Sequence, residues 1–200
     1  MKQIQYFIMA AFLWTGLTLN FAAQANAGEP LNLVKTAADS AIQILNDPTL
    51  QGKDKKKERI ERLKEAVNPI FDYEEMAKRS LGSHWRQRSP AEREEFVKLF
   101  RDFLEKIYSD KIDLYEGQKI VLGRETIDQD FAQVDSTIIN AKGEEFGVVY
   151  KLRRAEGKWK VYDAVIENIS IVNNYRSQFD RVIAKSSYDG LKKMLKDKAS

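Results

Sequence analysis

Two changes in the spacing of apolar residues divide this chain into three blocks. Before Gly117 the apolar side chains recur at helical spacing, as Phe96 and Phe100 do, and past Gly117 the period falls to two. After Ser170 the helical spacing returns. Helices followed by a block of consecutive strands and then by helices are typical of an α+β fold. We expect a single domain over 28–200, with a helical part at about 30–116, a sheet at about 117–167 and C-terminal helices at about 170–196.

The helical blocks contain recognisable start and stop residues. Pro30 suits the first turn of a helix, and Pro48 ends it. Asp72 with Glu75 three residues later predicts the start of a short helix. The segment Ser89-Pro90-Ala91-Glu92 combines a capping serine, a proline at the first helical position and a glutamate that completes a capping box.

Four strand candidates lie between these helical blocks, and short polar turns separate them, which favours an antiparallel meander. Strict alternation places Trp159, Val161, Asp163 and Val165 on one face of the last strand. Both faces of the central strands are partly apolar, so we expect a curved sheet that is wrapped around helices. The candidates are Lys119–Thr126, Phe131–Ile139, Phe146–Arg153 and Trp159–Ile166.

The N-terminus indicates export. Lys2 precedes an apolar run from Tyr6 to Phe21, and Ala25-Asn26-Ala27 matches the small-residue pattern that signal peptidase cleaves. The run is shorter than the roughly 20 residues of a membrane-spanning helix, so we favour a cleaved signal peptide at residues 1–27 over an anchor. Because the chain has no cysteine, lipidation on cysteine, disulfides and thiolate zinc sites are excluded. We therefore expect a soluble periplasmic protein.

Composition and motifs argue against several function classes. Without Lys2 the chain has 32 basic and 30 acidic residues, a near-balance that argues against a nucleic-acid binder. We find no nucleophile elbow, phosphate loop or dinucleotide pattern, and the single histidine, His84, has no evident metal-ligand partners. We expect no catalytic residue, no metal site and no cofactor. Asp163 is the one candidate for a general base, although a structural role for its carboxylate is the preferred interpretation.

Aromatic residues line one face of the helix that follows Ser89. They recur at i, i+4, i+7 and i+12 in Phe96, Phe100, Phe103 and Tyr108, with charged residues on the other face. Periodicity alone does not distinguish a filled core from the wall of a cavity. From its residues, the sequence predicts an exported α+β domain with a large apolar interior.

Two stretches resemble a known family. The first runs from Phe71 through Leu81-Gly82-Ser83-His84-Trp85-Arg86 to Phe96. The second runs from Gly157 through Glu167-Asn168-Ile169-Ser170 to Asn174-Tyr175-Arg176-Ser177-Gln178-Phe179. In order and spacing they are similar to the MlaC family, also called toluene-tolerance proteins, which are periplasmic phospholipid-binding components of a lipid-asymmetry pathway.

The resemblance implies an NTF2-like cone, with helices packed on a curved antiparallel sheet of four or slightly more strands. It also implies a deep apolar pocket for the acyl chains of a phospholipid, whose headgroup stays near solvent. The implied partners are an outer-membrane lipoprotein–porin complex and the MCE-domain component of an inner-membrane ABC transporter.

On this resemblance we expect a monomeric, non-enzymatic carrier that shuttles phospholipid between the outer and inner membranes. Arg176 is the candidate headgroup residue. Two alternatives stay open: an NTF2-like enzyme with Asp163 as general base, and a lipid-free scaffold that bridges envelope proteins. The expected lipid-binding residues are Met76, Trp85, Phe96, Phe100, Phe103, Leu104, Tyr108, Val148, Tyr150, Val161, Val165, Tyr175 and Phe179.

Overall fold

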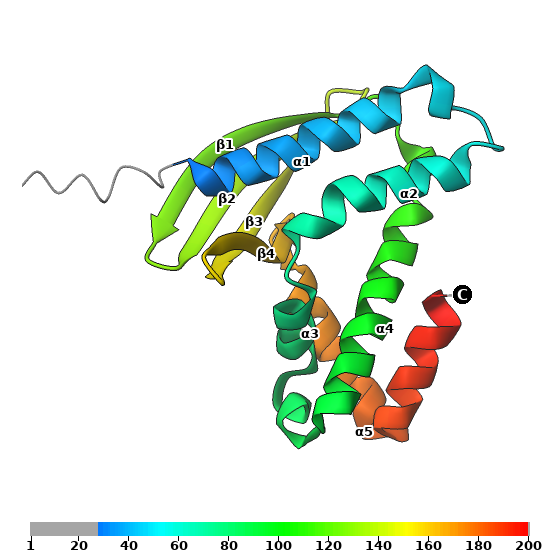
Figure 1. The fold of residues 1–200 in the computed structure, drawn as a ribbon, viewed down its shortest axis with the longest axis vertical. Helices are drawn as coiled ribbons and strands as arrows, with labels where there is room; N and C mark the ends of the chain where they lie inside the picture. Colours follow the sequence, from blue (N-terminus) through cyan, green and yellow to red (C-terminus); the bar gives the residue numbers. More distant parts are fainter. Residues whose placement is uncertain (1–27, 200) are drawn as a thin grey trace, which may run out of the picture.

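The protein folds into a strongly curved sheet that lies above a group of helices (Figure 1). The structure is a computed structural model that describes residues 28–199, so the expected signal peptide lies outside the described residues. The helices are α1 (Glu29–Asn46), α2 (Lys56–Val67), α3 (Tyr73–Leu81), α4 (Pro90–Ser109) and α5 (Ile171–Ala199). Short 3-10 helices are η2 (Pro48–Leu50), η3 (Asn68–Ile70), η4 (Gly82–Gln87) and η5 (Ile112–Leu114).

The strands form one antiparallel sheet in the order β1-β2-β3-β4-β5, which confirms the predicted α+β fold. The four long strands match the four candidates to within two residues at each end. The fifth strand is a two-residue addition at the edge of β4. The strands are β1 (Lys119–Asp128), β2 (Phe131–Ile139), β3 (Glu145–Ala155), β4 (Lys158–Ile166) and β5 (Ile169–Ser170).

A β-bulge in β4 overturns the expected alternation of its side chains. Leu152 pairs with Val161 but the preceding Lys151 pairs with Asp163, so Tyr162 is an extra residue in β4. An extra residue reverses the faces of everything that follows it. The prediction that Asp163 and Val165 share a face with Trp159 and Val161 is therefore wrong, because these two residues lie on the opposite face.

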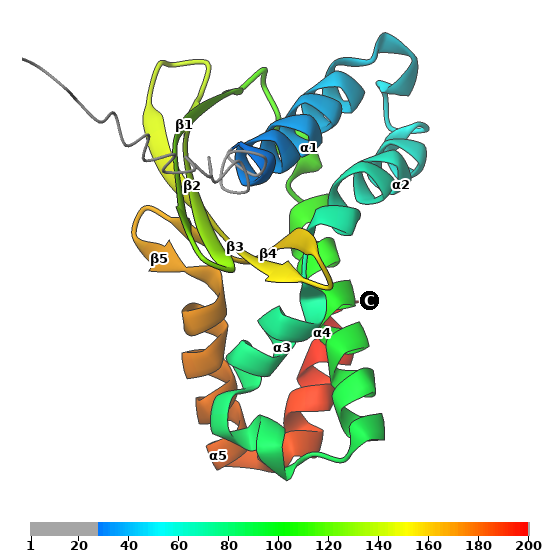
Figure 2. The same cartoon turned by 60° about the vertical axis from the view of Figure 1, so that its left-hand side comes forward.

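The concave face of the sheet, here called the α1 face, packs against α1 and contains one hydrophobic cluster. Val34 and Ala37 of α1 are buried against the sheet residues Val134, Leu152 and Val161. Figure 2 shows α1 lying in the curve of the strands, with α2 beside it. Burial of these side chains on the α1 face holds α1 against the sheet.

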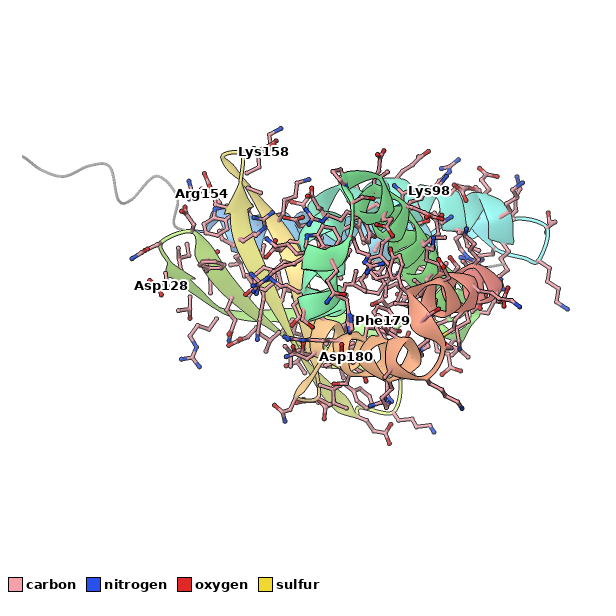
Figure 3. All side chains as sticks on the ribbon, turned by 90° about the horizontal axis from the view of Figure 1, so that it is seen from below. Lys98, Asp128, Arg154, Lys158, Phe179 and Asp180 are labelled. Atoms are coloured by element: carbon pink, nitrogen blue, oxygen red, sulfur yellow. The ribbon has the colours of Figure 1, made fainter. Side chains whose placement is uncertain are left out.

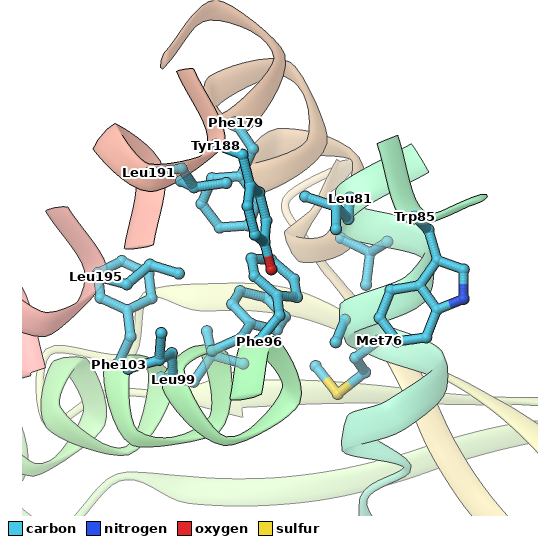
Figure 4. Packing of buried hydrophobic residues seen from close by; sticks show 14 residues of the cluster. Met76, Leu81, Trp85, Phe96, Leu99, Phe103, Phe179, Tyr188, Leu191 and Leu195 are labelled. Carbon is cyan, nitrogen blue, oxygen red and sulfur yellow. The ribbon is translucent and has the colours of Figure 1, made fainter. Parts of the chain in front are cut away.

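A second hydrophobic cluster holds α3, η4, α4 and α5 together below the sheet. Phe96, Phe100 and Phe179 are almost completely buried, and the Phe179 ring meets the Phe96 and Phe100 rings edge to face at 5.9 and 5.5 Å between centroids. Figure 4 shows Phe96 and Phe103 of α4 facing Phe179, Leu191 and Leu195 of α5, and Figure 3 places Phe179 between those helices as well. The three phenylalanines of the aromatic stripe of α4 thus fill a solid helical core, whereas Tyr108 at the end of the stripe lies outside it.

Both predicted helix starts are confirmed. The Ser89 hydroxyl accepts a hydrogen bond from the Glu92 amide, and the Glu92 carboxylate accepts one from the Ser89 amide, which completes the capping box. Asp72 Oδ1 accepts the Glu75 amide at 3.0 Å at the start of α3. Asp72 Oδ2 also accepts from Arg153 Nε at 2.7 Å, which ties the helical part to β3.

α5 consists of two helical arms that meet at Ser187. The backbone there has φ 83° and ψ 172°, which is not helical, so the second arm turns back along the first. Leu191 and Leu195 on the second arm complete the helical core. No helix within residues 28–199 is both long and apolar enough to cross a membrane.

Candidate functional site: an apolar cavity between helices and sheet

A cavity of about 320 Å³ lies where the two hydrophobic clusters meet. Its floor is the end of the α1 face, and its other walls come from α2, the start of α3 and the C-terminal half of α4. The lining residues are Ile60, Leu63, Lys64, Val67, Asn68, Phe71, Tyr73, Met76, Leu104, Glu105, Tyr108, Ser109, Ile112, Ile138, Val148, Tyr150, Ala164, Ile166 and Ile171.

The cavity exists because α2 does not fill the space that the curved sheet leaves. Val148 and Ala164 contribute short side chains to the floor, and both are buried. On α2, Ile60, Leu63 and Val67 recur at i, i+3 and i+7, so one apolar stripe faces the cavity. Apolar surface on both sides suits the cavity to hydrocarbon.

The cavity is open to solvent, since two of its apolar wall residues have substantial accessible surface. Tyr108 exposes 48% of its surface and Ile166 exposes 41%. Partial burial of Tyr108 against the neighbouring walls raises its pKa to about 12. The phenol therefore stays neutral at physiological pH and adds no charge to the cavity.

One edge of the cavity is polar. Glu105 Oε1 accepts a hydrogen bond from Asn68 Nδ2 at 2.8 Å, and its Oε2 lies 3.3 Å from Lys64 Nζ. Tyr73 donates its hydroxyl to Asn68 Oδ1 at 2.9 Å. These contacts join α2 and η3 to α3 and α4 at the edge of an otherwise apolar wall. The arrangement is amphipathic, as a lipid site requires.

Comparison with known proteins assigns the chain to a family. The MlaC family model, described as "MlaC protein", matches residues 35–197. The chain belongs to the MlaC family. It is 27% identical over 203 aligned residues to the intermembrane phospholipid transport system binding protein MlaC of Haemophilus influenzae, covering 98% of this chain and 94% of that protein.

A solved structure shares the MlaC fold. The phospholipid-binding protein from Ralstonia solanacearum, determined in complex with a phospholipid, matches with a TM-score of 0.72 at 24% identity. The match covers 84% of this chain and 95% of that one. This likeness confirms the fold that the resemblance implied.

Five of the expected lipid-binding residues meet at the cavity of this MlaC-family chain. Met76 comes from α3, Leu104 and Tyr108 come from α4, and Val148 and Tyr150 come from β3. These three elements meet at the cavity because the helical part packs against the end of the sheet.

The other expected residues lie elsewhere. Trp85, Phe96, Phe100, Phe103, Tyr175 and Phe179 pack within the helical core. Val161 is fully buried in the cluster beneath α1. Val165 lies on the opposite face because of the bulge at Tyr162. None of these eight side chains lines the cavity in the part of the chain that the structure describes.

Sequence reasoning missed most of the wall residues, and two groups of them show why. Ile60, Leu63 and Val67 carry a helical stripe that was visible, but the many charges of α2 made its solvated face more conspicuous. Ala164 and Ile166 were assigned to the wrong face, since no feature of the sequence marks the bulge.

Asp163 and Arg176 lie outside the cavity, on the opposite face of the sheet. Asp163 is 4% exposed, and its carboxylate accepts from Ser170 Oγ at 2.6 Å and from the Val172 amide at 3.1 Å. Arg176 borders a separate surface cleft of about 440 Å³ and passes close to Gly82, whose positive φ of 57° and missing Cβ make room for it.

The described residues 28–199 contain no group of three or more histidine, cysteine, aspartate or glutamate side chains placed to hold a metal ion. His84 has a partner that the sequence did not indicate, because its Nε2 lies 3.1 Å from Asp180 Oδ1 on α5. That contact joins η4 to α5 and lies within the helical part.

Proposed function

We propose that this protein is a periplasmic phospholipid carrier that shuttles lipid between the outer and inner membranes and so maintains outer-membrane lipid asymmetry. The observation that carries the proposal is the solvent-open apolar cavity between α2, α4 and the sheet. The name of the Haemophilus influenzae relative, which is an intermembrane phospholipid transport system binding protein, supports the same function.

The physical requirement for such a carrier is large. Exposing the roughly 30 methylenes of two acyl chains costs on the order of 24 kcal/mol, at about 0.8 kcal/mol for each CH₂. A carrier must replace nearly all of that apolar contact, so adsorption on a surface is insufficient. The carrier therefore needs an enclosed site whose walls are apolar.

The volume of the cavity implies that it expands on loading. At about 320 Å³ it lies at the lower end of the roughly 300–1,000 Å³ that small-molecule pockets occupy. Two acyl chains need more space than this, so lipid entry must separate α2 from the sheet. The Lys64–Glu105 ion pair joins α2 to α4, and such a polar contact can open as α2 moves.

The proposed acyl-chain walls follow the cavity. They are Met76, Leu104, Tyr108, Val148 and Tyr150, joined by Ala164, Ile166 and the α2 stripe. The buried rings of Phe96, Phe100 and Phe179 support these walls from behind by keeping α4 rigid. We propose that the signal peptide at 1–27 directs export. The proposed docking partners are the MCE-domain transporter component and the outer-membrane lipoprotein–porin complex, which a monomer would visit in turn.

The two alternatives have less support. Asp163 is poorly suited to act as a general base, since both carboxylate oxygens accept hydrogen bonds and the residue lies on the sheet face away from the cavity. A scaffold without lipid would need no cavity, whereas this chain keeps one beside a densely packed helical core.

A charge on the cavity wall tests the proposal. Ile166→Asp should abolish uptake of fluorescent phospholipid from vesicles, because a carboxylate among acyl chains would be desolvated without a partner. Protein and vesicles are separated by size exclusion, and the lipid bound to each protein molecule is counted.

Ile127→Asp is the matched control. Ile127 also lies in a strand and is 37% exposed against 41% for Ile166, but it does not line the cavity. We expect it to bind lipid normally. Equal lipid uptake by the two folded variants would refute the cavity as the lipid site.

A further inference from the structure

An ion pair interrupts the apolar wall of the cavity. Lys64 on α2 and Glu105 on α4 are the two charged residues among the described residues that line it. The Lys64 side chain is 32% exposed and the Glu105 side chain 15%, so the pair lies at the edge of the cavity, partly shielded from water.

A partly exposed ion pair of this kind adds little to the stability of a fold. Partly buried ion pairs lose much of their attraction to desolvation, and apolar residues of similar volume often replace them without loss of stability. An apolar pair of residues at this position would also extend the apolar wall of the cavity. Charge retained at this edge therefore points to an interaction with the ligand.

Lys64 stays charged, and both side chains are held in position. Burial alone would lower the pKa of Lys64, but hydrogen bonds to Glu61 and Glu105 outweigh it and raise the pKa above its ordinary value. Asn68 fixes the Glu105 carboxylate by donating from Nδ2 at 2.8 Å, and Arg101 Nε lies 3.6 Å from the same oxygen. The lining of the cavity thus presents one cation, Lys64, beside one anion, Glu105, while Glu61 and Arg101 contact them from outside the lining.

This arrangement matches a zwitterionic headgroup with a phosphate and a primary ammonium. The phosphate can take the Lys64 ammonium, and the headgroup ammonium can donate to the Glu105 carboxylate. One ion pair opens and two form, which offsets the cost of separating Lys64 from Glu105. The acyl chains would then extend toward Val148 and Tyr150 at the apolar floor.

An anionic headgroup fits less well. A glycerol headgroup has no cation that can pair with Glu105. Its phosphate would then lie close to the Glu105 carboxylate, and the two negative charges would repel each other. Repulsion between a ligand phosphate and a carboxylate rejects a ligand as effectively as good contacts select one.

We propose that Lys64 and Glu105 form a headgroup site that selects zwitterionic phospholipid carrying a primary ammonium over anionic phospholipid. The proposal rests on the carrier function proposed above and adds to it the headgroup class.

Native mass spectrometry of lipid uptake tests this selectivity. Delipidated full-length protein is incubated with vesicles of phosphatidylethanolamine and phosphatidylglycerol in equal amounts. We expect the wild type to take up phosphatidylethanolamine in about fivefold excess, the upper end of what one ion pair near a surface contributes. Glu105→Gln should bring the ratio close to that of the vesicles, and Glu105→Lys should favour phosphatidylglycerol.

Glu65→Gln is the matched control, because Glu65 lies next to Lys64 on α2, is exposed and does not line the cavity. It should keep the wild-type ratio. Identical lipid ratios in wild type and Glu105→Gln would overturn the headgroup site while leaving the carrier function intact. Loss of both lipids in Glu105→Gln would also overturn it, since the pair would then serve only to hold α2. A wild type that takes up no lipid would instead contradict the carrier function itself.

Discussion

Ser187 shows how one residue can carry strain at the turn between the two arms of α5. Its φ of 83° with ψ 172° lies in a region that favours glycine, where a side chain costs about 1–3 kcal/mol. The Ser187 hydroxyl partly compensates, because it accepts the Gly190 amide at 3.4 Å and caps the second arm. Strain and capping therefore oppose each other at a single position.

Substitutions at Ser187 separate the two effects. Ser187→Gly relieves the strain and loses only a few tenths of a kcal/mol of capping, so it should stabilise the fold by about 1 kcal/mol. Ser187→Ala keeps the strain and loses the cap, so it should destabilise by about 1 kcal/mol. Urea denaturation measures both, and a glycine variant less stable than the alanine variant would contradict the assignment.

Tyr108, which lines the cavity, makes the free energy of unfolding depend on pH in the alkaline range. Its pKa is raised by burial to about 12 in the folded protein, whereas a phenol in an unfolded chain titrates near 10. The contribution of this shift to stability is full below pH 10 and is lost as the pH rises through about 12, since the unfolded chain releases its proton first.

We therefore expect the free energy of unfolding to fall between pH 10 and pH 12, and to fall less steeply in Tyr108→Phe. Other buried tyrosines, including Tyr188, contribute to the same decline. Urea denaturation at a series of pH values measures the slope. An unchanged slope in the phenylalanine variant would show that the Tyr108 hydroxyl is not buried in the folded state.

At the scale of elements, Asp72 links the helical part to the sheet through hydrogen bonds. Its amide donates to the Val161 carbonyl at 2.8 Å, one carboxylate oxygen caps α3, and the other accepts from Arg153. The neighbouring Phe71 and Tyr73 line the cavity, so this link also positions two of its wall residues.

Asp72→Ala should cost about 2–3 kcal/mol, because it removes the cap and leaves the Arg153 guanidinium without its carboxylate. Asp72→Asn keeps a capping oxygen and should cost about half as much. Ser89→Ala, which removes an exposed cap without any link to the sheet, is the reference at about 1 kcal/mol. Equal losses in the two Asp72 variants, measured by chemical denaturation, would show that the cap contributes nothing and that the loss comes from the charge alone.

The same elements show how far the sequence predicts this structure. The starts of α3 and α4 were predictable because capping chemistry is local, and Asp72 and Ser89 sit three residues before the glutamates that they cap. The four long strands were predictable from their period. The bulge at Tyr162 was not predictable, because it depends on how β4 pairs with β3, and the sequence of β4 alone does not determine that pairing.

The candidate site was predictable only in part. The aromatic stripe of α4 is the strongest apolar feature of the sequence, but it packs against α5, which follows it by some 60 residues along the chain. The cavity instead uses the smaller side chains of α2 and the floor of the sheet. A cavity forms where packing is incomplete, and sequence periodicity reports only which side chains turn away from water.

At the scale of the whole molecule, loading should move α2 and leave the helical core unchanged. The cysteine-free sequence allows clean pairs of spin labels. Labels at Glu65→Cys and Lys142→Cys span α2 and the β2–β3 turn, and labels at Lys98→Cys and Asp189→Cys span α4 and α5. We expect lipid to lengthen the first distance and to leave the second unchanged. No change in the first distance on loading would contradict expansion by movement of α2.

The most direct test of the account is native mass spectrometry of the protein as it is purified from cells. We expect a species heavier than the polypeptide by the mass of one diacyl phospholipid, lost in Ile166→Asp and retained in Ile127→Asp. A wild-type spectrum that contains only the bare polypeptide, under conditions that preserve non-covalent lipid complexes, would contradict the claim that this cavity carries phospholipid.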